Sequence, residues 1–405
     1  MRTYFPMLFS SIVLLFISSL SLFLVRYLNQ QWWQNKNIRK AFYVVPLIGL
    51  ALNALWAMGT AASLSWLTAI GAGGVSIIFI ITFSVFLSLP IASVFNLVDR
   101  GLDHLRVKST ENQDGFSNSR RQFLRSTAAA FPLLTTSGGL TGLTRAFEEP
   151  RTPILPLRFK NLPPGLEGLK ILHLSDLHLG YYLGLKELEN LLARLEPHRP
   201  DLVLVTGDVA DKLELLPEVL RMIDALKPPL GTLASLGNHE YFRGIDAVLR
   251  HFEAGPSPLL RENGSVVQVD GAKIYVGGAD DPRAVIRTQS RSFLTETVDA
   301  AFAEAPSDAF KILMSHRPEG FVRASKRGID LTLAGHTHGM QIGINGRSVF
   351  EAWAPEKFLW GHYERGESQL YTSSGVGHWF PFRLGCPPEA PIIVLHKQAD
   401  DEDKV

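Results

Sequence analysis

The residues best suited to chemistry are His336 and His338, which follow the apolar run "LTLA" in the stretch "LTLAGHTH". They lie one residue apart, and alternate residues of an extended chain point to the same side. Two imidazoles that face one way are either a pair of nitrogen ligands for a metal ion or a coincidence. Other candidate ligand residues in the chain distinguish between these interpretations.

Four other apolar segments end in similar residues: "LKILHLSDLH", "DLVLVTGD", "GTLASLGNHE" and "FKILMSH". Their polar ends, in chain order, are Asp176 and His178, Asp208, Asn238 with His239 and Glu240, and His316. Each end alone has an ordinary interpretation, because Gly-Asp is common in turns and Ser or Asp often caps a helix. Five such ends in one chain favour a shared site, since open α/β sheets build their sites at the carboxyl ends of strands.

Histidine and carboxylate ligands together suit divalent manganese, iron or zinc. The chain offers seven candidate ligands: Asp176, His178, Asp208, Asn238, His316, His336 and His338. Seven ligands are too many for one ion, so two ions that share one bridging carboxylate are the simplest arrangement. The sequence shows no Ser-His-Asp arrangement and no glycine-rich phosphate loop, and the single cysteine, Cys386, lies outside all five segments.

The elements that must position these residues alternate between strands and helices at first. Helical spacing of leucines covers residues 185–200, and further helical patterns cover 214–226 and 246–253. Later segments read as consecutive strands, with "SVVQV" and "KIYVGG" as an antiparallel pair, followed by "FKILMSH", "DLTLAGH", "QLYTSSG" and "PIIVLHK". This order predicts a layered α/β (α+β) domain over residues 155–397, with helices outside the sheets.

The motif order D-x-H, G-D, G-N-H-[E/D], H and G-H-x-H resembles the calcineurin-like metallophosphoesterase superfamily, over about residues 169–338. The resemblance implies a four-layer β-sandwich flanked by helices and a metal-dependent phosphoric ester hydrolase. It assigns the first ion to Asp176, His178, Asp208 and His338, with Asp208 as the bridge. It assigns the second ion to Asn238, His316 and His336 together with that bridge. Two such ions would activate a hydroxide held between them and clamp the phosphoryl oxygens for in-line attack.

The resemblance also gives roles to two residues that are not ligands. His239 is expected to protonate the leaving oxygen or to stabilise the phosphoryl charge. Glu240 stands where many members have Asp, and it is expected to orient the His239 imidazole. Glu at this position, and the late segment "YTSSGVGHWFPFRLGCPPE", are similar to a membrane-associated bacterial branch. The residues of that late motif, expected to shape the substrate end, are Gly377, Pro381, Arg383 and Pro388.

The first quarter of the chain, residues 1–105, contains three apolar runs at about 5–25, 41–58 and 75–97. About 20 apolar residues in a helix suffice to cross a bilayer, so these runs predict transmembrane helices. Basic residues occupy the first loop and the segment after the third run, whereas residues 59–74 carry no charge. The positive-inside rule places the basic segments in the cytoplasm and the N-terminus outside.

Residues 106–118 are polar and are expected to form a linker, and 398–405 an acidic tail. The motif "SRRQFLR", followed by weakly apolar sequence, resembles a twin-arginine export signal over 119–147. The alternative is a surface basic cluster that opens an ordinary helix. If the signal is used, the domain at 155–397 lies in the periplasm. Without a clear cleavage site, the segment is expected to remain as a further anchor.

These observations predict a membrane-anchored, dinuclear-metal phosphoesterase of the bacterial inner membrane, acting on a phosphodiester or a lipid-linked phosphate. One alternative is hydrolysis of a UDP-linked diacylglucosamine at the cytoplasmic face, and another is a metal-binding homologue without catalysis. A transporter is disfavoured because the three apolar runs contain no acid or base. The net charge of +1 gives no indication of a nucleic-acid partner, and no protein partner can be inferred.

Overall fold

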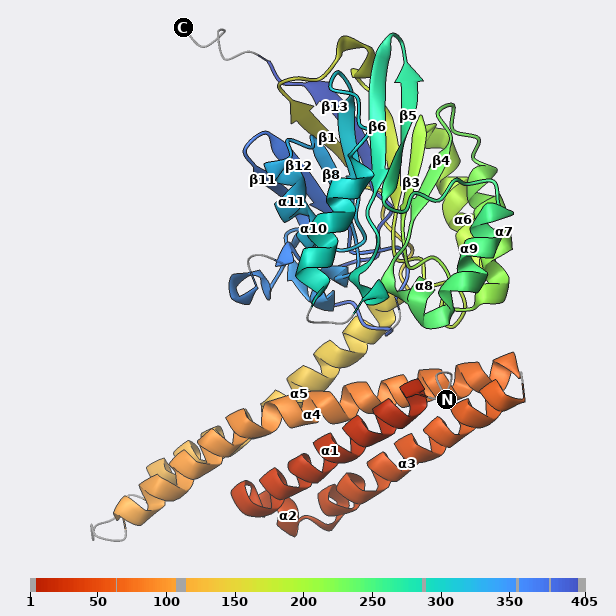
Figure 1. Ribbon diagram of the computed structural model, residues 1–405. Coiled ribbons are helices and arrows are strands. Elements are labelled where there is room, and N and C mark those ends of the chain that lie inside the picture. Colours follow the sequence, from red (N-terminus) through yellow and green to blue (C-terminus); the bar gives the residue numbers. More distant parts are fainter. Residues whose placement is uncertain are drawn as a thin grey trace, which may run out of the picture. The chain divides into compact units, whose positions relative to one another are not determined.

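The computed structural model describes residues 5–62, 64–106, 114–285, 289–354, 357–378 and 380–399. The chain divides into two compact units, Met1–Thr144 and Arg145–Val405, each of which is considered by itself (Figure 1). The expected linker residues 107–113 and the tail residues 400–405 lie outside the described residues.

Helices make up the described part of the first unit. They are α1 (Phe5–Leu28), α2 (Gln30–Gln34), α3 (Lys36–Ala61), α4 (Ser65–Arg106) and α5 (Asp114–Ala146). Among the described residues, three helices are long and apolar enough to cross a membrane: Met7–Leu28, Lys36–Ala61 and Trp66–Val98. Helix α3 starts before its apolar run because Asn35 caps it, accepting hydrogen bonds from the Asn37 and Ile38 backbone N–H groups.

Polar side chains join these apolar helices to one another. Asn53 of α3 donates to Ser11 Oγ of α1 over 3.0 Å and accepts from Ser10 Oγ over 3.0 Å. Asn29, after α1, donates to Ser93 Oγ of α4 over 2.8 Å. In an apolar environment such hydrogen bonds contribute to helix association, so α1, α3 and α4 are held in one bundle.

The twin-arginine-like segment lies inside α5, which begins at Asp114, within the range expected to be a linker. The backbone of Arg120 and Arg121 is helical. Helix α5 is not among the three helices that could cross a membrane by length and composition in the described chain. Its use as an export signal and as a further anchor stays a prediction.

Two sheets form the centre of the second unit. The first sheet has the order β1-β13-β2-β3-β4, in which all neighbours are parallel except β13 and β2. Its strands are β1 (Ile154–Phe159), β2 (Lys170–Leu174), β3 (Leu202–Thr206), β4 (Thr232–Ser235) and β13 (Ile392–Lys397). The last strand of the chain therefore lies inside this sheet, between β1 and β2.

The second sheet has the order β11-β12-β8-β7-β6-β5, with antiparallel pairs at its two edges and parallel pairs between them. Its strands are β5 (Asn263–Val269), β6 (Ala272–Gly278), β7 (Phe310–Met314), β8 (Leu331–Ala334), β11 (Gly361–Arg365) and β12 (Ser368–Thr372). A two-stranded sheet, β9 (Gly343–Ile344) and β10 (Arg347–Ser348), follows His336 and His338.

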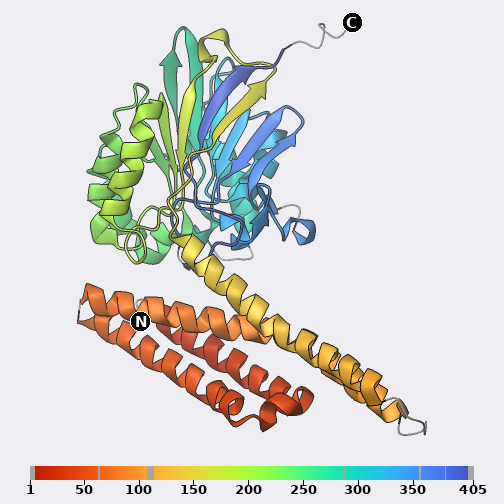
Figure 2. The same ribbon diagram turned by 180° about the vertical axis from the view of Figure 1, so that it is seen from behind.

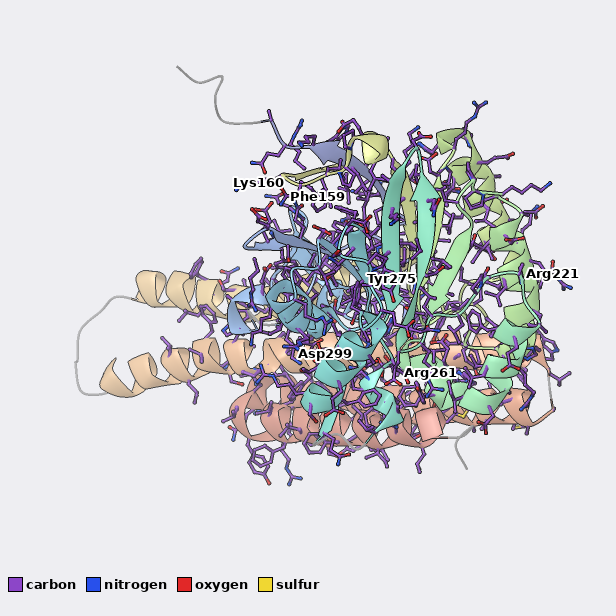
Figure 3. The ribbon with its side chains drawn as sticks, turned by 45° about the horizontal axis from the view of Figure 1, so that its top comes forward. Phe159, Lys160, Arg221, Arg261, Tyr275 and Asp299 are labelled. Atoms are coloured by element: carbon purple, nitrogen blue, oxygen red, sulfur yellow. The ribbon has the colours of Figure 1, made fainter. Side chains whose placement is uncertain are left out.

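The two sheets face each other, and helices cover their outer faces (Figures 1 and 2). Ile171 of β2 lies in the core between the sheets, whereas its neighbour Leu172 lies in the core under the helices. Both faces of the strand are buried, which explains its nearly continuous apolar sequence. Phe159 of β1, labelled in Figure 3, meets Phe310 of β7 edge-to-face, with ring centroids 5.0 Å apart, across the space between the sheets.

The helices of the first sheet's outer face are α6 (Leu185–Leu195), α7 (Leu216–Asp224) and α9 (Ile245–Glu253). Those of the second sheet are α10 (Ser290–Ala301) and α11 (Phe321–Lys326). The helix α8 (Asn238–Arg243) begins directly at the "GNHE" motif. The predicted four-layer sandwich of two sheets flanked by helices is confirmed.

Candidate metal centre

Five loops converge at one edge of the sandwich. They follow β2, β3 and β4 of the first sheet and β7 and β8 of the second. Each of these five strands runs parallel to a neighbour from the same group, so the carboxyl ends lie together within each sheet. The loops carry all nine residues that the sequence singled out for the site, which are Asp176, His178, Asp208, Asn238, His239, Glu240, His316, His336 and His338.

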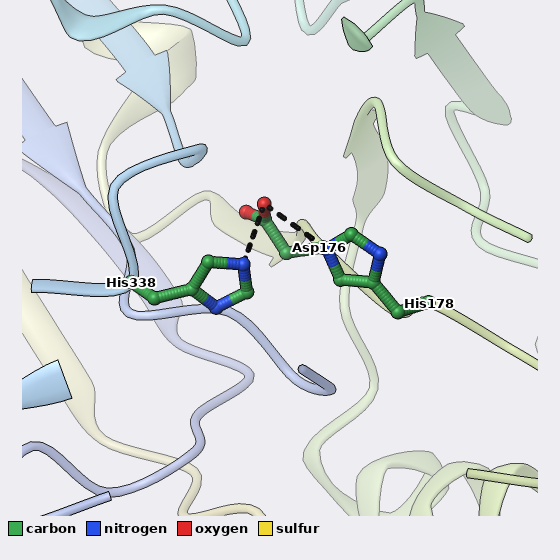
Figure 4. A group of neighbouring side chains, drawn as sticks. All are labelled: Asp176, His178 and His338. Atoms are coloured by element: carbon green, nitrogen blue, oxygen red, sulfur yellow. Dashed lines mark ion pairs between the residues drawn. The ribbon is translucent and has the colours of Figure 1, made fainter. Parts of the chain in front are cut away.

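The first group of side chains that could hold a metal ion consists of Asp176, His178 and His338, all buried (Figure 4). His338 Nε2 lies 3.4 Å from Asp176 Oδ1, and His178 Nε2 lies 3.8 Å from the same oxygen. Both imidazoles therefore turn one nitrogen towards one carboxylate oxygen, as the ligands of a shared cation do.

The second group consists of Asp208, His316 and His336. Asp208 Oδ2 lies 3.3 Å from His316 Nε2 and also 3.6 Å from His178 Nε2 of the first group. Its other oxygen, Oδ1, accepts the backbone N–H of His239 over 2.8 Å. One oxygen of Asp208 thus anchors the loop, while the other lies between the two groups.

Several buried polar atoms at this edge have no hydrogen-bond partner among the described residues. They are His178 Nε2, His316 Nε2 and Asn238 Oδ1. A buried polar atom without a partner is costly in free energy, and each of these atoms is a metal-ligand type. The donor set therefore fits divalent cations.

The charges around the centre also favour a bound cation. Burial alone would lower the pKa of His316, but the carboxylates of Asp208 and Asp176 outweigh it and raise the pKa to about 10. These two carboxylates thus create a buried region that favours positive charge, which a divalent cation would satisfy.

The second nitrogen of two imidazoles faces an oxygen atom. His316 Nδ1 lies 2.8 Å from the Thr206 carbonyl oxygen, to which it donates. His178 Nδ1 lies 3.3 Å from Asp211 Oδ2. Because His316 Nδ1 keeps its proton for the Thr206 carbonyl oxygen, its Nε2 presents a lone pair to the centre.

The backbone is unusual at five of the candidate ligands. Positive φ values occur at Asp176 (52°), His178 (48°), Asp208 (51°), His336 (69°) and His338 (49°). Residues other than glycine rarely adopt this left-handed conformation, which costs free energy. The loops also pack closely here, since a Cβ atom on Gly335 would overlap Asp176 Oδ2 and Ser175 Oγ. Only glycine therefore fits before His336.

His239 has a different partner from the one expected. Its Nδ1 lies 2.6 Å from Asp211 Oδ1, and Arg243 donates to the same oxygen over 2.7 Å. Burial would lower the pKa of His239, but Asp208 and Asp211 raise it to about 9. Asp211 is the functional residue that sequence reasoning missed, although it lies three positions after Asp208 in "GDVAD".

The expectation that Glu240 orients His239 is wrong. Glu240 is buried, and its carboxylate accepts the backbone N–H groups of Asp208 (2.9 Å), Val209 (2.8 Å) and Gly237 (2.8 Å). As the third residue of α8 it faces back to the start of its own helix and to the β3 loop. Glu240 therefore holds two ligand-bearing loops together and does not contact the His239 ring.

Arg383 of the late motif lies behind the ligands and not at an exposed substrate end. Its side chain is fully buried and donates to the carbonyl oxygens of Ser374 and Gly377, each over 2.6 Å. Its Nη2 lies 3.0 Å from His338 Nδ1. The segment it fastens also pairs with the first ligand loop, since Gly377 donates its N–H to the Asp176 carbonyl over 2.7 Å.

Comparison with known proteins places this geometry in a family. The model of the calcineurin-like phosphoesterase domain matches residues 169–340. An uncharacterized metallophosphoesterase of Aquifex aeolicus is 31% identical over 248 residues, covering 58% of this chain and 88% of that protein. The phosphodiesterase YaeI of Escherichia coli is 28% identical over 292 residues, covering 68% of this chain and 99% of that protein.

A transmembrane protein with a metallophosphoesterase domain from Bos taurus is 29% identical over 280 residues, covering 65% of this chain and 61% of that protein. The chain belongs to the calcineurin-like phosphoesterase family, and it is a metal-dependent phosphoric ester hydrolase. The family and the His/Asp clusters indicate divalent metal ions as the cofactor. The apolar helices and the transmembrane relatives indicate association with a membrane.

Proposed function

We propose that this chain is a membrane-anchored hydrolase with two divalent metal ions, which cleaves a phosphodiester or a lipid-linked phosphate ester. The observation that carries the proposal is the position of Asp208 Oδ2, which lies 3.3 Å from His316 Nε2 and 3.6 Å from His178 Nε2. A carboxylate oxygen that faces ligands of both groups is suited to bridge two cations.

In this proposal the first ion is held by Asp176, His178, Asp208 and His338, and the second by Asp208, Asn238, His316 and His336. Manganese, iron and zinc all accept this mixture of imidazole, carboxylate and amide donors. Ions bound here would supply charge neutralisation for the phosphoryl oxygens and a water acidic enough to attack at neutral pH.

The protein itself supplies the proton for the leaving group. His239 Nδ1 is held by Asp211, so Nε2 turns towards the centre, where it lies 4.0 Å from Asp208 Oδ2. Besides Asp208, the hydrogen bond and the charge of Asp211 raise the pKa of His239, and this contact favours the protonated imidazole. A protonated imidazole at the edge of the centre can donate to the oxygen on which negative charge develops.

The membrane unit supports a lipid-linked substrate, because a tether concentrates the site at the bilayer surface. The proposed location is the inner membrane, with the phosphoesterase unit on the periplasmic side. The similarity to a protein named phosphodiesterase supports a diester as the alternative to a lipid-linked monoester.

The test uses the full chain in detergent micelles and in phospholipid vesicles. After loading with Mn²⁺, hydrolysis of bis-p-nitrophenyl phosphate, p-nitrophenyl phosphate and a long-chain lipid phosphate is measured. We expect turnover that is lost in Asp208→Asn. A fully metal-loaded chain that cleaves none of the three esters would overturn the proposal, whereas cleavage of the soluble esters alone would remove its lipid-linked part.

A further inference from the structure

Arg317 follows the candidate ligand His316 directly, in the loop after β7. Its guanidinium turns to the same edge of the sandwich as the metal centre, because Arg317 Nη1 lies 2.6 Å from Nε2 of His336 in the second ligand group. The arginine therefore stands beside the proposed position of the second ion.

A buried carboxylate holds Arg317 in this place. Arg317 Nε donates to Asp281 Oδ2 over 2.9 Å, and Nη2 lies 3.5 Å from Asp281 Oδ1. The Asp281 side chain is fully buried, whereas that of Arg317 is 26% exposed. One edge of the Arg317 guanidinium thus faces the buried Asp281 carboxylate. The rest of the side chain is partly exposed to solvent beside the metal centre.

The guanidinium has capacity for a further acceptor. It carries five N–H groups, and its described partners take one each from Nε, Nη1 and Nη2. One N–H group on each terminal nitrogen has no partner among the described residues. Two N–H groups at the end of an arginine match the spacing of two oxygens on a phosphoryl group.

We propose that Arg317, held by Asp281, binds a non-bridging phosphoryl oxygen of the substrate and of the phosphate product next to the second metal position. This inference rests on the proposed function and adds to it a residue that recognises the phosphoryl group. Since no bond to Arg317 forms or breaks in the reaction, its contribution is to binding and orientation.

A matched control is Arg261, which lies between α9 and β5 and is labelled in Figure 3. Arg261 Nε donates to Asp280 Oδ2 over 2.8 Å, so it also pairs with a buried aspartate, at the position before Asp281. Its side chain also contacts the Tyr241 hydroxyl, 3.3 Å away, and its backbone N–H donates to Asn263 Oδ1, so none of its described hydrogen-bond partners is a candidate ligand. Loss of Arg261 removes a similar ion pair without removing a group from the centre.

The experiment measures binding of inorganic phosphate to the metal-loaded full chain by calorimetry, together with metal content by elemental analysis. Arg317→Met should weaken phosphate binding by about 10–100-fold, the range for loss of charge-assisted hydrogen bonds. The metal content should stay unchanged, and Arg261→Met should bind phosphate as the parent does. Arg317→Lys keeps the charge but not the paired N–H geometry, so it should recover only part of the affinity.

A single Arg317→Met change leaves Asp281 buried without its cation, which is destabilising. The double variant Arg317→Met with Asp281→Asn removes both charges and keeps the test valid if the single variant does not fold. Phosphate binding within threefold of the parent in a folded, metal-loaded variant would overturn the inference. Phosphate binding that weakens only because the Arg317→Met variant has lost metal would also overturn the inference. Arg317 would then act by positioning the ligand His336.

Calorimetry does not depend on turnover, so the two proposals can fail separately. A chain that binds phosphate through Arg317 but cleaves no ester would contradict the proposed function alone. A chain that cleaves esters and binds phosphate equally well without Arg317 would contradict this inference alone.

Discussion

Asp211 contacts both His239 and His178, with one carboxylate oxygen for each imidazole. Asp211 Oδ1 lies 2.6 Å from His239 Nδ1, and Oδ2 lies 3.3 Å from His178 Nδ1. A single buried side chain therefore orients the proposed proton donor and one proposed metal ligand. One residue therefore fixes the position of the His239 imidazole relative to the His178 imidazole, and a change at Asp211 affects both.

Replacement of His239 separates proton donation from metal binding. His239→Ala should lower kcat by ~10²–10⁴, the range for loss of a general acid, while the metal content measured by elemental analysis stays at the parent value. Full activity in this variant would remove His239 from the mechanism, and loss of metal would make it a ligand.

Asp211→Asn should lower kcat and move the alkaline limb of the pH profile. Burial lowers the pKa of His239, and Asp208 and Asp211 raise it, so removal of one carboxylate lowers the pKa. Activity that requires protonated His239 is present below this pKa and is lost above it, and the limb should therefore shift to lower pH. A limb that stays in place in Asp211→Asn, measured as kcat against pH, would contradict His239 as the acid.

The partition of ligands predicts a graded loss of metal. Elemental analysis of the parent chain should give about two ions per chain. His338→Ala removes a ligand of the first group only and His316→Ala one of the second only, so each should leave about one ion. Asp208→Ala removes the proposed bridge and should reduce both. A parent chain that saturates with one ion, or an Asp208 variant that keeps both, would refute the dinuclear arrangement.

Glu240→Gln tests the structural role found for this carboxylate. Its oxygens accept three backbone N–H groups at 2.8–2.9 Å, and an amide has only one oxygen to offer. The variant should unfold at a temperature about 4–8 °C lower, which corresponds to a loss of about 2 kcal/mol. Calorimetric scanning of the metal-free chain measures this shift. An unchanged midpoint combined with a large loss of kcat would restore Glu240 to a catalytic role.

The sidedness of the phosphoesterase unit can be tested through the paired arginines of α5. Changing Arg120 and Arg121 both to Lys should leave this unit in the cytoplasm, because a receptor reads the twin-arginine motif and not its charge. The basic charge is unchanged, so the three apolar helices should keep their topology. A C-terminal reporter that is active only after export reads the result. A cytoplasmic C-terminus in the unmodified chain would refute export and favour a substrate at the cytoplasmic face.

Much of the sandwich could be predicted because its central strands are short apolar runs that end in polar motifs. The strands β2, β3, β4, β7 and β8 all lie where the sequence indicated them. The edge strands β1 and β11 were missed. Their exposed faces interrupt the apolar pattern, and β1 contains Pro156 in "ILPLRF". The pairing of β1 with β13 joins opposite ends of the domain, which no local pattern reveals.

At the site, the motifs predicted which residues lie together but not how their side chains point. Asp211 was missed because its role depends on two histidines from other loops. Glu240 was given the wrong partner because adjacency to His239 suggested contact, whereas consecutive residues at a helix start face different directions. The burial of Arg383 depends on its contacts with Ser374 and His338, which a linear motif does not specify.

The position of β13 has a consequence for the order of events during synthesis. Residues 392–397 fill the gap between β1 and β2, so the first sheet cannot close before β13 has left the ribosome. The segment that supports Asp176 from behind, including Gly377, also arrives late. The apolar helices are made first, and nascent chains fold from the N-terminus. The phosphoesterase unit therefore closes its first sheet only after β13 has been made, later than the apolar helices, and a chain cut short before Ile392 would lack the strand that joins β1 to β2.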